Sequence, residues 1–507
     1  MSVQLYNTLT RTKEPLELEP TKAGEREADG IRMYVCGPTT YNYIHLGNAR
    51  ALVVFDTIRR YLEYRGYRVT FVQNFTDIDD KIINRAREEG VEPSKLAQRY
   101  IHEYFRDAEA LNVRRADFHP RVSENLDDII EMIRVLIKKG YAYQVDGDVY
   151  FRVDSFPGYG KLSGRSPQEM LAGARVEPDP RKENPLDFAL WKASRAGEPA
   201  WNSPWGAGRP GWHIECSTMA TKYLGLPLDI HGGGADLIFP HHENEIAQTE
   251  AATGTTFARY WVHNGFVTVN EEKMSKSLGN FFLVREILER FPGPVVRFFL
   301  LSTHYRNPVD FDFDKLAAAE KGYERLQGTL SLLAEVEAED QGPNQGRIKS
   351  APTGGETTAG DMGSLASLTE RCRVEFEKAM DDDFNTALAI AALFDFSRGV
   401  NSIVTKAKAE EIRAMAGQLR QARRLLLQLG EGVLGLFPQQ AADAPAMRVA
   451  ETSGHLAGAL IDLLLEVRQR AREKKDWAMA DYIRDRLREL NIVVEDTPRG
   501  PRWREEQ

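Results

Sequence analysis

The segment that decides the fold is residues 30–73, GIRMYVCGPTTYNYIHLGNARALVVFDTIRRYLEYRGYRVTFVQ. Apolar residues alternate over 30–36, and residues 67–73 resemble them, which predicts two short strands. Residues 46–64 carry one mostly apolar stripe at helical spacing, which predicts a helix between the strands. A strand, a helix and a strand within about 45 residues form a βαβ unit and imply a parallel sheet. Ligands of such sheets bind at the carboxyl ends of the strands, so we expect the functional site near residues 36–39 and 74–80.

The composition is that of an ordinary soluble protein. Of its 507 residues, 42% are hydrophobic and 28% are charged, and no uninterrupted apolar run approaches the roughly 18 residues of a membrane span. The first residues lack a charged start followed by an apolar run, so a signal peptide is not expected. Three cysteines cannot form a disulfide framework and fit a reducing cytoplasm. A net charge of −9 argues against non-specific nucleic-acid binding but allows a local basic face.

Changes of pattern along the chain predict several domains. Strand-like and Gly/Pro-rich stretches at about 115–208 indicate an insertion that splits the parallel sheet. Residues 341–363 are rich in Gly, Pro and Thr and predict a flexible linker. Helical stretches follow the linker. The final segment combines a basic helix near 461–490 with a short strand at 492–495.

Two of the three cysteines lie near other residues that bind metals. Cys36 follows the first strand, and Cys216 lies shortly before the segment that contains His241 and Glu245. His241 and Glu245 are four residues apart and follow a proline, so they should share one face of a helix. Together the four could form a Cys₂-His-Glu zinc site. The alternative is that the cysteines are small buried residues and the other two a surface pair. His242 is the rival ligand, but the residue four positions later is an isoleucine.

Three further motifs are typical of nucleotide sites. His45-Leu-Gly-Asn48 begins the predicted helix, where unpaired N–H groups attract phosphate and Gly47 permits close approach. Lys273-Met-Ser-Lys-Ser277 places two lysines in a loop that could close on a triphosphate. His231-Gly-Gly-Gly-Ala-Asp236 follows a predicted strand, and Asp236 could accept from ribose hydroxyls. Taken singly, a helix cap or core residue explains the first motif better and a solvated basic turn explains the second better, whereas a tight loop explains the third equally well.

The remaining polar and aromatic features have simpler explanations. Residues 77–80 could be paired catalytic carboxylates, but a helical pattern follows, so capping and surface roles are predicted. Residues 381–383 are similarly predicted to start a helix, and Cys372 to be a buried helical residue. Trp212 could wall a small pocket. In the C-terminal segment, basic residues alternate with aromatic ones that could stack on bases; a solvated amphipathic helix is the alternative.

In combination, His45-Leu-Gly-Asn48 and Lys273-Met-Ser-Lys-Ser277 resemble the two signatures of class I aminoacyl-tRNA synthetases. Asn48 stands where the general signature has histidine; it can donate a hydrogen bond but cannot carry charge. The surrounding sequence resembles the cysteinyl-tRNA synthetase family over nearly the whole chain. The segments that carry this resemblance are Leu5-Tyr-Asn-Thr-Leu-Thr10, Tyr34-Val-Cys-Gly-Pro-Thr39, Asn74-Phe-Thr-Asp-Ile-Asp-Asp-Lys81, Gly211-Trp-His-Ile-Glu-Cys-Ser217, 231–245, Asp382-Asp-Phe-Asn-Thr-Ala387 and Glu495-Asp-Thr-Pro-Arg-Gly500.

The resemblance implies an α/β fold: a Rossmann-type parallel-sheet catalytic domain with an insertion, then a helical bundle and a small mixed α/β domain. The implied boundaries are 1–265 for the catalytic domain, 266–320 for a lysine-loop domain, 321–437 for the bundle with its linker, and 438–507 for an anticodon-binding domain. It implies one zinc per chain, bound by Cys36, Cys216, His241 and Glu245. The implied amino-acid pocket is Gly37, Thr39, Thr76, Trp212 and His231. ATP, with Mg²⁺, would contact His45, Gly47, Asn48, Asp236, Lys273 and Lys276, of which His45, Asn48 and the two lysines would act in catalysis.

The implied reaction has two steps. The carboxylate of L-cysteine attacks the α-phosphate of ATP, and a ribose hydroxyl of tRNA(Cys) then takes the acyl group. Zinc would recognise the substrate thiolate, because a hydrophobic pocket separates cysteine from serine by only about 10²-fold. The family precedent is a cytoplasmic monomer without a membrane partner. A ligase joining cysteine to an amino sugar would not need the basic C-terminal segment, and an inactive tRNA-binding protein would not need intact lysine and metal-ligand sets.

Overall fold

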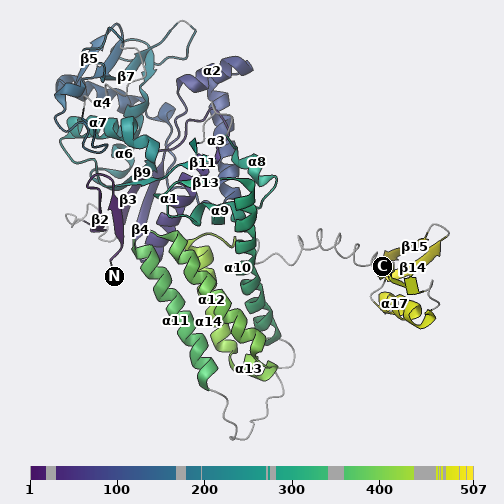
Figure 1. The fold of residues 1–507 in the computed structure, drawn as a ribbon. Helices are drawn as coiled ribbons and strands as arrows, with labels where there is room; N and C mark the ends of the chain where they lie inside the picture. The colour runs from purple at the N-terminus through teal and green to yellow at the C-terminus, as the bar shows by residue number, and fades with distance from the viewer. Residues whose placement is uncertain are drawn as a thin grey trace. The chain divides into compact units, whose positions relative to one another are not determined.

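The structure is a computed structural model, drawn as a ribbon in Figure 1. Contacts divide the chain into two units, residues 1–438 and 439–507, and each is described by itself. The residues described are 2–18, 30–166, 169, 179–195, 197–269, 272–273, 281–340 and 359–438 in the first unit, and 464–465, 467–468, 470–471, 476–489, 492–497 and 500–505 in the second.

A parallel four-stranded sheet forms the centre of the first unit and confirms the predicted βαβ arrangement. Its strand order is β10-β9-β3-β4, and helix α1 connects β3 to β4. Val35 pairs with Gln73 on one side and with Gly232 on the other, so three carboxyl ends lie side by side. The elements are β3 (Gly30–Val35), α1 (Leu46–Tyr64), β4 (Arg68–Gln73), β9 (Leu228–Gly234) and β10 (Ala258–Asn264).

An antiparallel sheet with the order β5-β6-β7-β8 lies between β4 and β9 in the sequence, within the predicted insertion. Helix α6 follows it and carries Cys216, and α7 begins just after His241 and His242. The elements from β4 to β10 are α2 (Asp80–Glu89), α3 (Pro93–Ala110), α4 (Leu126–Lys138), β5 (Ala142–Val145), β6 (Asp148–Phe151), β7 (Phe188–Ala193), β8 (Gly208–Pro210), α6 (Trp212–Leu224) and α7 (Glu243–Thr253).

A small three-stranded sheet, β12-β11-β13, follows the parallel sheet. Strand β11 pairs with β12 in antiparallel and with β13 in parallel orientation. Lys273 ends β12, whereas Lys276 lies outside the described residues. The elements are β11 (Val267–Val269), β12 (Glu272–Lys273), α8 (Val284–Leu288), α9 (Gly293–Leu301) and β13 (Val309–Asp310).

The helical bundle packs α10 and α11 with α12 and α14, which run side by side in Figure 1. By length and composition alone α12 could span a membrane. Several of its large apolar side chains, among them Leu393, Phe396 and Val400, are nevertheless buried in the same core as Cys372, which is a buried helical residue as predicted. The elements are α10 (Phe313–Asp340), α11 (Ala359–Asp381), α12 (Thr386–Lys406), α13 (Ala409–Ala414) and α14 (Ala416–Leu427).

Two predictions for the bundle need correction. Of the predicted linker 341–363, residues 341–358 lie outside the described part, but residues 359–363 form the start of α11. Residues 381–383 do not start a helix: Asp381 ends α11, and Asn385 caps α12. Asp383 is fully buried in the turn, where its carboxylate accepts three hydrogen bonds from two other segments.

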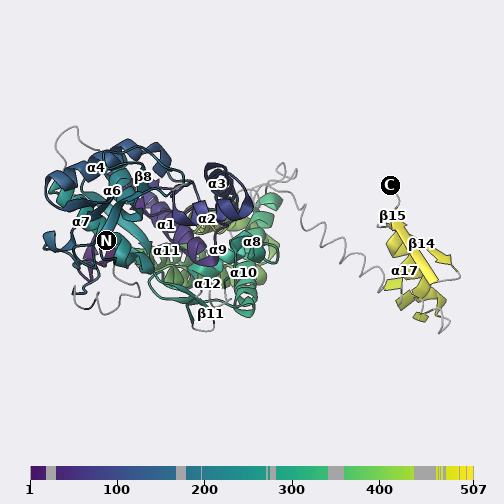
Figure 2. The ribbon, with the colours of Figure 1, turned by 90° about the horizontal axis from the view of Figure 1, so that it is seen from above.

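The second unit contains α17 (Trp477–Glu489) and the antiparallel hairpin of β14 (Ile492–Thr497) and β15 (Gly500–Glu505), which lie together in Figure 2. Leu465, Ile483 and Leu487 form its small core. Its content matches the predicted mixed α/β composition.

A buried carboxylate on α1 joins this helix to α9 and the bundle. Asp56 Oδ2 accepts from Arg60 Nε at 2.7 Å and from Arg297 Nη2 at 2.6 Å. Arg297 Nε in turn donates to the carbonyl of Leu434 at 2.6 Å. Burial alone would raise the pKa of Asp56, but the two arginines lower it below its ordinary value. The carboxylate is therefore ionised, and its removal would leave the fully buried Arg297 without a carboxylate partner among the described residues.

We expect Asp56→Ala to cost about 3–5 kcal/mol of stability, because breaking a buried ion pair leaves an uncompensated charge. Urea unfolding of the first unit measures this loss. The matched control is Asp395→Ala, which breaks the exposed pair with Arg398 and should cost no more than about 1 kcal/mol. Equal losses in the two variants would contradict this account.

Candidate active site and metal centre

A cavity of about 310 Å³ opens at the carboxyl ends of β3 and β4, where the sequence predicted the site. It brings together eight of the predicted site residues from three separate segments. These are Cys36, Gly37, Thr39, His45, Gly47, Asn48, Trp212 and Asp236.

The start of α1 faces this cavity and is capped by the predicted nucleotide motif. His45 Nδ1 accepts from the Asn48 backbone N–H at 3.2 Å, and Asn48 Oδ1 accepts from the His45 backbone N–H at 3.2 Å. This reciprocal capping fixes both side chains at the positive end of the helix dipole. It leaves Nε2 as the only ring atom of His45 that could donate to a phosphate.

Gly37 allows the ends of β3 and β4 to approach more closely than any side chain would permit. A Cβ atom at this position would lie 1.6 Å from the backbone oxygen of Asn74. The Gly37 N–H donates to Asn74 Oδ1 at 2.9 Å. Thr39 and Thr76, both predicted to line the amino-acid pocket, form a β-bridge just beyond. The approach at Gly37 therefore sets the distance between the two sides of the pocket.

Four predicted metal ligands converge beside this cavity. The Sγ atoms of Cys36 and Cys216 are 3.7 Å apart, and Cys36 Sγ lies 3.3 Å from Glu245 Oε1. His241 Nε2 lies 2.9 Å from the same carboxylate oxygen. All four ligand atoms lie within 4.8 Å of one another. A tetrahedral zinc with bonds of about 2.0–2.3 Å separates its ligand atoms by about 3.3–3.8 Å, so the residues present fit this metal.

The rival ligand His242 also reaches the cluster. Its Nε2 lies 3.3 Å from Cys36 Sγ, and with Cys36, His231 and Glu245 it forms a second group with metal-binding spacing. The two groups share Cys36 and Glu245, so they cannot both be filled by separate ions with four ligands each. The group containing Cys216 has two sulfur ligands, which favours zinc more strongly.

His241 and His242 are each held by another histidine. His241 Nδ1 lies 2.8 Å from His213 Nδ1, and His242 Nδ1 lies 2.8 Å from His263 Nε2. His231 Nε2 contacts Glu245 Oε2 at 2.8 Å. Such partners fix the ring orientation of a metal ligand.

Three family models match the chain. The model of the class I (C) tRNA synthetase catalytic domain matches residues 23–321, the DALR domain matches 375–438, and the cysteinyl-tRNA ligase anticodon binding domain matches 458–504. A cysteine–tRNA ligase of Moorella thermoacetica is 60% identical over 501 residues, which are 99% of each chain. One of Pelotomaculum thermopropionicum is 58% identical over 512 residues, covering 99% of this chain and 100% of the relative.

The chain belongs to the cysteine–tRNA ligase family. Among solved structures, the Mycobacterium tuberculosis methionyl-tRNA synthetase bound by methionyl-adenylate aligns with a TM-score of 0.59 and 18% identity. The alignment covers 82% of this chain and 95% of the other. At this identity the likeness concerns the fold alone, which is that of a class I aminoacyl-tRNA synthetase.

In this member of the family, the environment of the cluster shifts the pKa values of its groups in different directions. Burial alone would raise the pKa of Cys216, but hydrogen bonds with Cys36 and His241 lower it to about 6. Burial raises the pKa of Cys36 well above its ordinary value. Burial would also raise the pKa of Glu245, yet His231 and His241 hold it well below the ordinary value. The pKa shifts of the two thiols are therefore opposite in direction.

Three of the remaining predicted residues, Trp212, Thr76 and Asp236, lie near the cluster or the cavity. Trp212 is 41% exposed, and its ring stacks on His241 with centroids 4.2 Å apart. The Thr76 hydroxyl donates to Glu215 at 2.7 Å. Asp236 is exposed at the rim of the cavity, in the turn after β9. Lys273 follows at the end of β12.

Sequence reasoning missed several residues of the site. Asn74, His213 and His263 each contact a site residue. The only sequence signal for them was their place: Asn74 and His213 lie inside motifs that carry the resemblance, and His263 lies near the end of a strand. The prediction for 77–80 is confirmed for Asp79, which caps α2. Asp80, whose side chain is 46% exposed, pairs with Lys192 and Arg209, which agrees with the predicted surface role.

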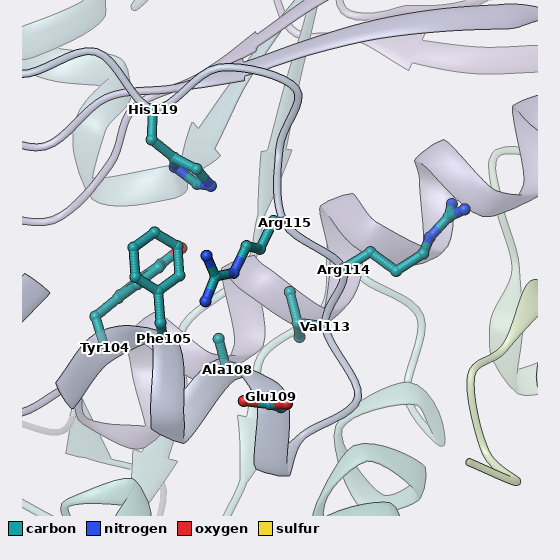
Figure 3. Close-up of a pocket in the computed structure, with 8 residues that line it drawn as sticks. All are labelled: Tyr104, Phe105, Ala108, Glu109, Val113, Arg114, Arg115 and His119. Carbon is teal, nitrogen blue, oxygen red and sulfur yellow. The ribbon is translucent and has the colours of Figure 1, made fainter. Parts of the chain in front are cut away.

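A second cavity, of about 180 Å³, lies behind the first and shares Tyr104 with it. Figure 3 shows the Arg115 guanidinium turned toward the rings of Tyr104 and Phe105, and it lies 4.3 Å from the Phe105 centroid. His119 Nδ1 lies 2.9 Å from the carbonyl of Gln73, and burial lowers the pKa of His119 to about 4. These side chains therefore support Gln73, at the end of β4, from behind.

We expect Gly37→Ala to lower adenylate formation at least about 100-fold, since an added Cβ would displace one wall of the site and 1 Å of misplacement can cost that much. ATP–pyrophosphate exchange measures it. Gly328→Ala in α10 is the matched control, because a Cβ there meets nothing within 4 Å. Activity in Gly37→Ala equal to that of the control would refute the close-approach argument.

Proposed function

We propose that this cysteine–tRNA ligase forms cysteinyl adenylate in the 310 Å³ cavity, with zinc recognising the substrate thiol, and then charges tRNA(Cys). The observation that carries the proposal is the Cys₂-His-Glu group beside a cavity that also receives the start of α1. Amino-acid selection and nucleotide binding can then occur in one space.

Cys36, Cys216, His241 and Glu245 would hold the zinc. When bound, the metal favours a soft, ionised thiol over a hydroxyl, which ionises far less readily. Trp212 supports this assignment, because its stacking on His241 places an aromatic wall against one ligand. The partner of His241 on its other ring nitrogen, His213, would keep Nε2 aimed at the metal position.

Gly37, Thr39, Thr76, Trp212 and His231 would line the amino-acid pocket. Gly37, Thr39 and Trp212 line the cavity, and Thr76 lies beside Thr39. His231 lies deeper, fully buried against Glu245, so in this pocket it would act by holding the carboxylate. These contacts would orient the cysteine carboxylate for attack on ATP.

ATP would bind between the start of α1 and the lysines. His45, Gly47 and Asn48 place a helix N-terminus at the cavity wall, where a phosphate is favoured. Asp236 at the rim would accept from the ribose hydroxyls. Lys273 and Lys276 would stabilise charge on the phosphates, with Mg²⁺ accompanying the nucleotide.

The tRNA would be held in part by residues 438–507, as the family match at 458–504 supports. This match argues against a ligase acting on an amino sugar. Our boundaries at 320 and 437 are supported by family matches that end at 321 and 438. We further propose a cytoplasmic location, where the ligand cysteines stay reduced. The monomeric state stays a prediction.

We expect Cys216→Ser to lose bound zinc and to lower the preference for cysteine over serine to about 10²-fold or less, the limit for a pocket without a metal. Zinc content and ATP–pyrophosphate exchange with each amino acid measure the two effects. Cys372→Ser is the matched control, since Cys372 is equally buried but lies in the bundle. An unchanged preference for cysteine in Cys216→Ser would contradict a role of zinc in selecting cysteine over serine.

Lys276→Ala should lower kcat for adenylate formation by about 10²–10³-fold, the usual effect of removing one stabilising donor, and should change cysteine binding much less. Lys315→Ala, which breaks a surface ion pair with Asp310, serves as the control and should keep full activity. Full activity in Lys276→Ala would reject its role at the phosphates.

A further inference from the structure

Arg50 is a fully buried cation on α1, two residues after the ATP motif. Among the described residues its guanidinium has no carboxylate partner and binds backbone carbonyls only. Nη1 donates to Phe266 at 3.2 Å, and Nη2 donates to His304 at 3.3 Å, to Tyr305 at 3.2 Å and to Asn307. Burying a charge against carbonyl dipoles alone is costly. A purely stabilising role would therefore not account for burying this guanidinium, because its burial costs free energy.

The carbonyls that Arg50 binds belong to the two connections that lead into the small sheet. Phe266 lies between β10 and β11, and residues 304–307 connect α9 to β13. Strand β11 pairs with both β13 and β12, and β12 ends at Lys273. One guanidinium therefore holds both connections that lead into this sheet. Beyond Lys276, the chain returns to the start of α1, where the Leu46 N–H donates to the Phe282 carbonyl at 3.0 Å.

The same segment, 304–307, is held from its other side by Asp383 of the bundle. Asp383 Oδ1 accepts from the Tyr305 hydroxyl at 2.7 Å, and Oδ2 accepts from Arg306 Nε at 2.7 Å. Asp383 Oδ1 also accepts from the Tyr6 backbone N–H at 2.8 Å. Arg50 thus binds the backbone of the segment, and Asp383 binds its side chains.

We propose that Arg50 and Asp383 are positioning residues that fix segment 304–307, and with it the sheet ending in Lys273, against the ATP motif of α1. The inference rests on the proposed binding of ATP between that motif and the lysines. Loosening either contact would let the two sides of the ATP site shift relative to each other. The cysteine pocket and the metal ligands lie on β9, α6 and α7, on the segments that follow β3 and β4, and on the segment before α7, and they would keep their geometry.

The test uses Arg50→Lys, which keeps the charge but loses the planar fork, and Asp383→Asn, which keeps an acceptor for Tyr305. Asparagine also tolerates the positive φ of 63° at this position. In ATP–pyrophosphate exchange, each variant should raise KM for ATP and lower kcat, with a combined loss of at least about tenfold. KM for cysteine and zinc content should stay within about twofold. In the double variant, the loss of kcat/KM for ATP should be smaller than the product of the two single losses, because both residues act through one segment.

Arg297→Lys is the matched control. Arg297 is as buried as Arg50 and donates to the carbonyls of Leu111, Asn112 and Leu434 and to Asp56 of α1, but among the described residues none of its hydrogen bonds reaches Phe266 or segment 304–307. It should lower the melting temperature without changing KM for ATP. Unchanged ATP parameters in folded Arg50→Lys and Asp383→Asn would overturn the proposal, as would equal increases of KM for ATP and cysteine in all three variants. If Arg50→Lys does not fold, Asp383→Asn, which replaces a single oxygen, decides alone.

Failure of this inference can be told apart from failure of the proposed lysine role. Lys276→Ala tests the lysine without touching Arg50 or Asp383. If Lys276→Ala is fully active while Arg50→Lys loses ATP affinity, the positioning holds and the lysine assignment fails. If Lys276→Ala loses activity while Arg50→Lys keeps its affinity for ATP, the positioning role is rejected and the lysine role stands.

Discussion

The backbone contact between Gly37 and Asn74 is the constraint on which the site depends. It draws together the ends of β3 and β4, so that Cys36 on one side and Thr76 on the other reach the same cavity. Parallel pairing with β9 adds the third strand end. Because the three strands share one edge, residues separated by as many as 200 positions can act on a ligand no larger than an amino acid.

A second requirement is that charges buried beneath the cavity be paired. Glu245 is fully buried and has a histidine on each carboxylate oxygen, His241 on Oε1 and His231 on Oε2. An isolated buried carboxylate would be too costly, so the carboxylate, the histidines and the thiols form one interdependent group. This dependence explains why the ligand set cannot be altered one residue at a time without disturbing its neighbours.

The fold could be predicted from the sequence where the signal was local. The alternation of 30–36 and the stripe of α1 specify the βαβ unit, and the spacing of His241 and Glu245 correctly places both side chains together. Residue chemistry suggested the whole ligand set as one of two alternatives, and only the family resemblance favoured it, because no local pattern brings Cys36 to Cys216. The contacts of His213, His242 and His263 join distant segments, so the sequence offered no periodicity for them. Asp383 was misjudged for the same reason: its partners come from β1 (Gln4–Asn7) and from segment 304–307.

Helix α1 has a consequence for how this chain can vary in length. Its 19 residues carry, in order, the capping motif, Arg50, Asp56 and Tyr61, and each of these contacts a different part of the first unit. Inserting or deleting one residue would rotate everything beyond it by about 100° and shift it by about 1.5 Å along the axis. All contacts on one side of the change would be lost together. The length of α1 is therefore fixed to the residue, and insertions and deletions between homologues should fall in the connections outside it.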